Sequence, residues 1–110
     1  MKALVLHEID GPDKLNYEDA PDPEPGSGET VVRLHAAALN RRDVFVTRGQ
    51  YPGAKPEALP VILGSDGSGE VVARGEGADG PDEGTEVVIN PALYWGDDPQ
   101  KPGKEYRILG

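Results

Sequence analysis

The chain has 110 residues, a length that fits one domain with one modest hydrophobic core. It carries 20 acidic and 11 basic residues, and the resulting net charge of −9 argues against a nucleic-acid partner because phosphate backbones repel it. The absence of cysteine excludes disulfides, cysteine nucleophiles and thiolate metal ligands.

The first predicted element is a short apolar strand at Lys2 to Leu6. A turn at Gly11 to Asp13 and a second short strand at Leu15 to Tyr17 follow it. Glu8 places an acidic residue in the opening segment, which therefore differs from a signal peptide, and no apolar run is long enough to cross a bilayer. We expect a cytoplasmic protein that does not bind a membrane.

Two contrasting segments come next. Residues 21–28 contain three prolines, which lack the N–H donors that a central strand needs, so this segment is predicted to be an exposed connector. Residues 29–39 alternate with period two and predict the best strand of the chain, with Val32 and Leu34 on its apolar face. His35 lies on the opposite face, where we expect it to be solvated or bound by a local partner.

At Asn40 the pattern changes from strand to helix. Asn40 is a favourable N-cap, Asp43 stands three residues later as in a capping box, and Gly49 suits the position after the last turn. The helix would have about two turns. Arg41 and Arg42 leave two interpretations open: they hold an anion beside the helix start, or capping explains the polar residues and both arginines lie in solvent.

The rest of the chain predicts loops and short strands. Residues 50–60 and 91–104 are predicted loops, and further strands are expected at residues 70–74, 86–90 and 106–109. Because the last strand stops where the chain stops, we expect that the chain was cut from a longer protein. Together these elements predict a mainly β fold with one short helix, arranged as a small, partly open barrel.

The glycine-rich segment Gly64 to Gly69 has to be tested as a phosphate-binding loop. A dinucleotide-binding loop leads into a helix, whose N–H groups face the pyrophosphate, and here a β-branched strand follows instead. We therefore expect a tight turn with backbone positions at positive φ.

Metal binding and hydrolysis have little support in the sequence. The potential metal ligands are His7, His35, Asp43, Asp66 and Glu70. No pair of them shows a spacing typical of zinc sites. Ser65 and Ser68 have no histidine near them in the sequence and do not form a nucleophile elbow. We predict no metal site.

The motifs, taken in order, resemble the medium-chain dehydrogenase/reductase superfamily. The most specific are Leu39-Asn40-x-x-Asp43 and the glycines at positions 64, 69 and 75; the others are residues 1–5, 31–43, 48–52, 59–66 and 87–90. The resemblance covers nearly the whole chain. It implies that residues 1–110 form a GroES-like catalytic domain on the substrate side of the enzyme. The Rossmann domain that binds NAD(P)H in this superfamily is absent from the chain.

Departures from the zinc-dependent branch of that superfamily are informative. Asn40 stands where that branch has a cysteine ligand, and Ser65 stands where it has a histidine ligand. Residues 91–103 lack the four cysteines of its structural zinc lobe. The chain therefore resembles the quinone-oxidoreductase-like branch, which works without zinc. The cofactor implied is NADP or NAD, and this branch usually uses NADPH.

The resemblance implies roles for individual residues. Asn40 and Asp43 would be catalytic, and Asn40, Arg42, Tyr51 and Ser65 would bind substrate or cofactor. The Asn40 amide would hydrogen-bond the nicotinamide or the substrate carbonyl, and Asp43 would fix the helix start below the cleft. Tyr51 lies where the family places an aromatic or hydroxyl group near the substrate. The two adjacent arginines replace small or apolar residues and leave open whether the substrate is anionic.

The implied reaction is hydride transfer to or from a quinone, an enone or an alcohol/carbonyl substrate, in a homodimer or homotetramer. No general acid is evident, so orientation and stabilisation of a developing oxyanion would do most of the work. Two alternatives stay open: a non-catalytic GroES-like binding or co-chaperonin module, and a zinc dehydrogenase with substituted ligands. Neither predicted exposed loop, 21–28 or 75–84, carries the short apolar tripeptide expected of a co-chaperonin.

Overall fold

The computed structural model describes all 110 residues, which form three small β-sheets, one α-helix and two short 3₁₀ helices. The chain divides into two compact units. Residues 1–20, 39–65 and 90–110 form the first unit, and residues 21–38 and 66–89 form the second. The prediction of a mainly β fold with one short helix is confirmed. None of the helices has the length and apolar character needed to span a membrane.

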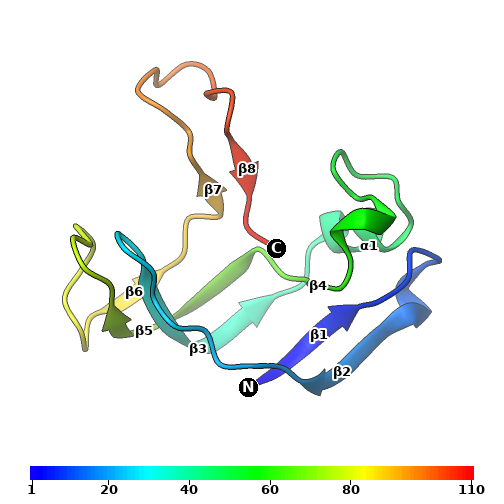
Figure 1. Cartoon of the computed structure of the whole chain (residues 1–110), viewed down its shortest axis with the longest axis horizontal. Helices are drawn as coiled ribbons and strands as arrows, with labels where there is room; N and C mark the ends of the chain where they lie inside the picture. The colour runs from blue at the N-terminus through cyan, green and yellow to red at the C-terminus, as the bar shows by residue number, and fades with distance from the viewer. The chain divides into compact units, whose positions relative to one another are not determined.

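The first unit is built on a three-stranded sheet whose middle strand is β1 (Lys2–Leu6), as Figure 1 shows. It pairs antiparallel with β2 (Leu15–Asp19) on one side and with β4 (Val61–Ile62) on the other. The 3₁₀ helix η1 (Pro12–Lys14) forms the turn predicted between β1 and β2. A second 3₁₀ helix, η2 (Pro56–Ala58), interrupts the predicted loop before β4.

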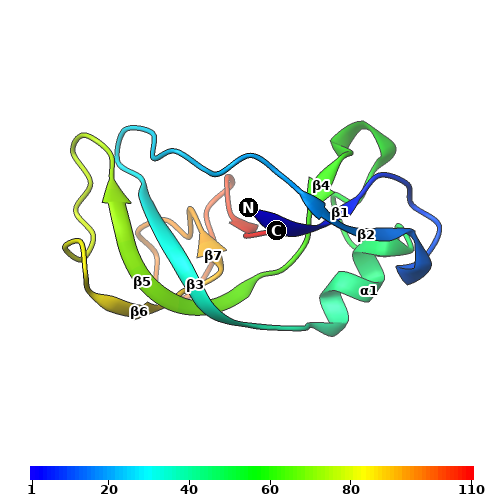
Figure 2. The ribbon, with the colours of Figure 1, turned by 90° about the horizontal axis from the view of Figure 1, so that it is seen from below.

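The helix α1 (Arg41–Thr47) packs against this sheet (Figure 2). Val46 of α1 joins Leu6 of β1 and Leu63 in the buried core. The partly buried residues around that core are Ile9, Leu15, Tyr51, Ala54, Leu59 and Val61. The Gly11 N–H donates to the carbonyl of Thr47 at 2.9 Å, so the turn after β1 supplies a donor to the end of the helix.

The second unit is a sheet of β3 (Thr30–Ala38), β5 (Asp66–Arg74) and β6 (Glu86–Val88), with β5 in the middle (Figure 2). All its pairings are antiparallel. Val71 of β5 is buried, but Leu34 of β3 is 52% exposed, so the predicted apolar face of β3 is covered only in part. The unit consists of these three strands and their loops, and no second layer within it covers the sheet.

The expected tight turn at residues 64–69 is wrong beyond its first residue. Gly64 has a φ of +118°, but strand β5 already begins at Asp66 and pairs with β3. Gly69 lies opposite Leu34, and a Cβ atom on it would stand 2.0 Å from the carbonyl oxygen of Arg33. The close approach of β3, rather than a turn, therefore requires glycine at position 69.

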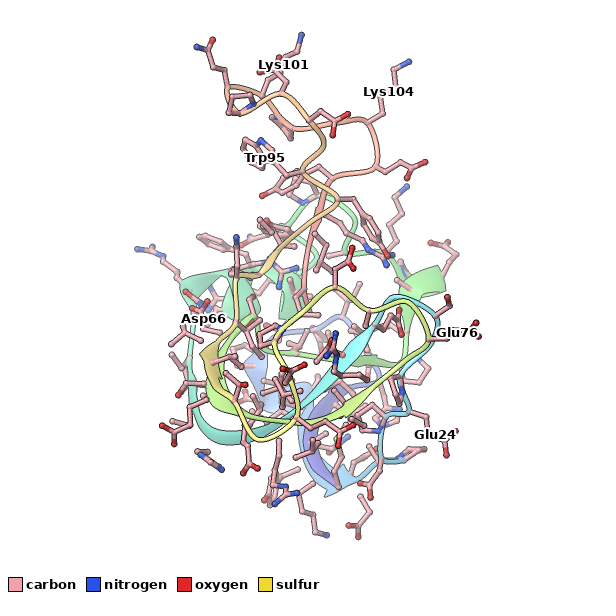
Figure 3. All side chains as sticks on the ribbon, turned by 90° about the vertical axis from the view of Figure 1, so that its left-hand side faces the viewer. Glu24, Asp66, Glu76, Trp95, Lys101 and Lys104 are labelled. Carbon is pink, nitrogen blue, oxygen red and sulfur yellow. The ribbon has the colours of Figure 1, made fainter.

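A third, two-stranded sheet consists of β7 (Ala92–Leu93) and β8 (Arg107–Ile108). Strand β7 lies in a segment predicted to be loop, because two residues are too few to show a period. The Trp95 and Tyr106 rings meet edge to face with their centroids 5.2 Å apart. Lys101 extends away from the loop that joins the two strands (Figure 3).

The contact at Gly69 predicts a large steric penalty. Gly69→Ala should lower the free energy of unfolding by about 3 kcal/mol or more, because the new methyl group meets backbone that cannot turn aside. Gly26→Ala is the matched control, since the non-neighbouring atoms nearest to its methyl group belong to the flexible Glu29 side chain, and it should cost less than about 1 kcal/mol. Urea unfolding of both variants measures the difference, and equal stabilities would contradict the prediction.

Candidate functional site

The start of α1 has the predicted capping box. Asn40 has an extended backbone, and its N–H donates to Oδ2 of Asp43 at 3.0 Å. The Asp43 N–H donates to the backbone carbonyl of Asn40 at 3.0 Å, and the Asn40 side chain also faces this N–H. Asp43 is 8% exposed, so this carboxylate holds the first helical turn from a buried position.

The other end of α1 brings Tyr51 back toward the core. Gly49 adopts a φ of +67°, and its N–H donates to the Val46 carbonyl at 3.0 Å. The N–H of Gln50 donates to the Phe45 carbonyl at 2.8 Å. This reversal leads the chain directly to Tyr51, which packs against the core as a partly buried residue.

Arg42 connects three segments that are far apart in the sequence. Its guanidinium carbon lies 4.6 Å from the centroid of the Tyr51 ring. Nη1 donates to Oγ of Ser65 at 3.3 Å, and Nη2 donates to the carbonyl oxygen of Gly110 at 2.5 Å. The Arg42 side chain is only 16% exposed, so the interpretation that both arginines lie in solvent is wrong for Arg42.

The Arg42 charge lies near a carboxylate that it does not hydrogen-bond. Nη1 stands 3.9 Å from Oδ1 of Asp43, which is too far for a hydrogen bond. Oδ1 of Asp43 and Nε of Arg42 are both buried and make no hydrogen bond. The two residues therefore attract each other without forming the bidentate pair that is typical of arginine and carboxylate.

The Arg41 side chain differs from that of Arg42 in its exposure and in its contacts. It is exposed, and its guanidinium carbon lies 5.5 Å from the centroid of the Phe45 ring on the same helix. It makes none of the contacts that hold Arg42. The two consecutive arginines, which look equivalent in the sequence, thus differ in burial and in partners.

All the predicted site residues lie in the first unit, and a chain of contacts connects them. We call this set the Arg42 cluster; it consists of Asn40, Arg42, Asp43, Tyr51 and Ser65. Ser65 is 4% exposed. Gly110, which lies outside this set, also contacts Arg42, and sequence reasoning missed that contact. A Cβ atom on Gly110 would stand 2.2 Å from the Gly64 carbonyl oxygen, and no sequence signal shows that approach.

Two open hollows lie elsewhere on the chain. The residues that line the first are His7, Glu8, Ile9, Pro56, Leu59 and Pro60. Those that line the second are His35, Ser68, Gly69, Glu86, Val87 and Val88. Neither hollow includes a residue of the Arg42 cluster. His35 is exposed, as predicted. Near the first hollow, the hydrogen bond to Glu8 raises the pKa of Lys14 above 10.5.

The donor set of the Arg42 cluster does not fit zinc. Nowhere in the chain do three His, Cys, Asp or Glu side chains gather closely enough to share a metal ion. Asn40 and Ser65 offer an amide and a hydroxyl, which are weak zinc ligands beside thiolate and imidazole. Arg42 also places a cation within hydrogen-bond distance of Ser65.

The family of the chain follows from its match to a family model. The model described as the alcohol dehydrogenase GroES-like domain matches residues 26–107. The chain belongs to this family. The predicted GroES-like fold is thereby confirmed, with sheets that do not close into a complete barrel.

Individual relatives agree with the family. The zinc-type alcohol dehydrogenase-like protein of Schizosaccharomyces pombe is 42% identical over 82% of this chain and 26% of its own length. The crystal structure of an NAD-dependent alcohol dehydrogenase is similar over all of this chain and 33% of that one, with 44% identity and a TM-score of 0.85.

A quinone oxidoreductase is also among the relatives. The Escherichia coli quinone oxidoreductase, crystallised with NADPH, matches 80% of this chain and 26% of its own, with 27% identity and a TM-score of 0.72. The predicted membership of the medium-chain dehydrogenase/reductase superfamily is confirmed by these matches. The chain spans about a quarter of the length of the curated relative from S. pombe.

The capping box predicts a specific cost for losing the Asp43 carboxylate. Asp43→Ala leaves the Asn40 N–H without its acceptor and should lower the free energy of unfolding by about 1–2 kcal/mol. Asp13→Ala is the control, because exposed Asp13 in the first turn of η1 makes no side-chain cap; it should cost less than about 0.5 kcal/mol. Denaturant unfolding distinguishes the two, and a neutral Asp43→Ala would show that the box does not stabilise α1.

Proposed function

We propose that this chain is the substrate-side domain of an NAD(P)H-dependent oxidoreductase. The proposed enzyme transfers hydride to or from a quinone, an enone or an alcohol/carbonyl substrate. The observation that carries the proposal is the Arg42 cluster, which gathers an amide, two hydroxyls and a guanidinium within a domain of the alcohol dehydrogenase family. Relatives named alcohol dehydrogenase and quinone oxidoreductase support a nicotinamide cofactor.

The proposal places the nucleotide-binding domain outside these 110 residues. The chain spans between about a quarter and a third of the relatives, which leaves most of their length for another domain. Within the chain, Gly64 to Gly69 run into β5 and not into a helix, so they do not form the turn and helix start that bind a pyrophosphate. In this proposal the residues of this chain contact only the reactive end of the cofactor.

The substrates proposed share one chemical feature. A quinone, an enone or a ketone accepts hydride at carbon while negative charge develops on its carbonyl oxygen, and the nicotinamide supplies the hydride. The Asn40 amide and the hydroxyls of Tyr51 and Ser65 are donors that suit such an oxygen. The Asp43 carboxylate accepts a hydrogen bond from the backbone N–H of Asn40. This bond fixes the backbone position from which the Asn40 side-chain amide extends.

Zinc has no part in this proposal, since the donor set of the Arg42 cluster does not suit the ion. The name of the S. pombe relative includes the words zinc-type, so the alternative of a zinc dehydrogenase with substituted ligands has a direct test. Stoichiometric zinc in the purified protein would favour that alternative. A cytoplasmic location and assembly as a homodimer or homotetramer stay predictions.

The activity is tested on the protein encoded by the complete gene. It should bind NADPH with a change in nucleotide fluorescence and oxidise it with quinone or enone acceptors, whereas residues 1–110 alone should be inactive. Asn40→Ala should lower kcat/KM by about 10- to 100-fold, because it removes a donor at the reacting centre. Asn16→Ala, at an exposed position of β2, is the matched control and should leave kcat/KM unchanged.

Three results would count against this function. A complete gene product that binds no NADPH would reject it. Binding of NADPH without turnover would favour the non-catalytic GroES-like module. Turnover by residues 1–110 alone would contradict the proposal that a separate domain binds the nucleotide.

A further inference from the structure

We propose that Arg42 is a positioning residue, which orients the hydroxyls of Ser65 and Tyr51 toward the substrate oxygen and does not itself bind an anionic substrate. This inference rests on the proposed function and adds to it. It assigns the cluster to substrates recognised through a neutral carbonyl group. The contacts of Arg42 carry the argument.

The first step concerns the direction of the Ser65 proton. A serine hydroxyl can donate one hydrogen bond and accept others, but a guanidinium group has only donors. Because Nη1 of Arg42 donates to Ser65 Oγ, the Ser65 proton has to point away from Arg42. A cation on the acceptor side also polarises the O–H bond, and this strengthens Ser65 as a donor.

The second step concerns the Tyr51 ring. The guanidinium of Arg42 lies over its face at 4.6 Å, and the ring also packs against the core formed by Leu6, Val46 and Leu63. These contacts restrict the ring and therefore the place of its hydroxyl. A planar guanidinium can stack on the ring and hydrogen-bond at its edge at once, which an ammonium group cannot do.

The third step explains why Arg42 itself is a poor anion ligand. Nη2 is engaged by the Gly110 carbonyl at 2.5 Å, Nη1 by Ser65, and Nε is buried. The side chain is 84% covered, since only 16% of it is exposed. Two of the five N–H donors of the guanidinium are thus engaged, and burial of the side chain restricts the access of an anion to the other three. Arg42 thus acts on the substrate through its neighbours.

A double-mutant cycle in the complete gene product tests the inference. Arg42→Met should lower kcat by up to about 100-fold, because Ser65 and Tyr51 lose their orientation, and should change KM by less than about 3-fold. Ser65→Ala should lower kcat by about 100-fold. The double variant Arg42→Met/Ser65→Ala should be no more than about 3-fold slower than the slower single variant, because both changes remove the same donor.

Two comparisons make the test specific. An uncharged enone and an enone that carries a carboxylate should lose activity to the same extent in Arg42→Met. Arg41→Met is the matched control: it removes the neighbouring exposed guanidinium, which lies over the Phe45 ring, and should leave kcat unchanged. If Arg42→Met does not fold, Arg42→Lys replaces it in the same double-mutant cycle with Ser65→Ala. Lysine keeps the positive charge but loses the planar group that stacks on the Tyr51 ring.

The outcomes separate the inference from the function on which it rests. NADPH binding by Arg42→Met at wild-type affinity, with the loss confined to kcat, supports the positioning role. Independent, multiplicative losses in the double variant would overturn it. So would a KM increase restricted to the carboxylate-bearing enone, which would make Arg42 an anion ligand. Absence of NADPH binding in the wild-type protein would instead reject the proposed function.

Discussion

The Arg42 cluster depends on one hydrogen bond, from the backbone N–H of Asn40 to the carboxylate of Asp43. That bond fixes the residue at which strand geometry stops and helix geometry starts. A helix that began one residue earlier or later would rotate each following side chain by about 100° around its axis. Arg42, the second residue of α1, would then no longer face Tyr51 and Ser65. The capping box is therefore a constraint on the site as well as on the stability of the helix.

Burial of Arg42 raises a question of energetics, because its side chain is largely covered while its nearest carboxylate is 3.9 Å away. Transfer of a cation from water is costly unless protein groups replace its hydration. Here the Tyr51 ring face, the Ser65 hydroxyl and the Gly110 carbonyl replace it. Guanidinium is more weakly hydrated than ammonium, so arginine suits this environment better than lysine does. These three groups therefore offset part of the desolvation cost of the guanidinium.

The features that could be predicted from the sequence are those that neighbouring residues determine. The capping box follows from the spacing of Asn40 and Asp43, and the short mixed strands follow from period-two patterns between glycines and prolines. The set of candidate site residues came from the family resemblance, and their proximity is an observation of the structure. Their proposed roles stay predictions.

The features that the sequence could not predict depend on contacts between residues that are far apart in the chain. From the sequence Gly69 was expected to be a turn glycine. In the structure glycine is required there because a Cβ atom would stand 2.0 Å from a backbone oxygen of β3. Strand β7 has two residues, too few for a pattern, and becomes visible only through its pairing with β8. Nothing local distinguishes Arg41 from Arg42; Tyr51, Ser65 and Gly110 decide which of the two is buried.

Charge compensation connects these features to the proposed chemistry. A carbonyl that accepts hydride develops negative charge on oxygen, and a protein can stabilise that charge with a metal ion or with oriented donors. In this chain the Arg42 guanidinium lies over the Tyr51 ring, and its Nη1 lies 3.3 Å from the Ser65 oxygen. A hydroxyl polarised in this way presents a strong donor without a bare cation at the surface. Such an arrangement favours a neutral carbonyl that becomes charged during the reaction, because oriented hydroxyl donors interact more strongly with the developing oxyanion than with the neutral ground state.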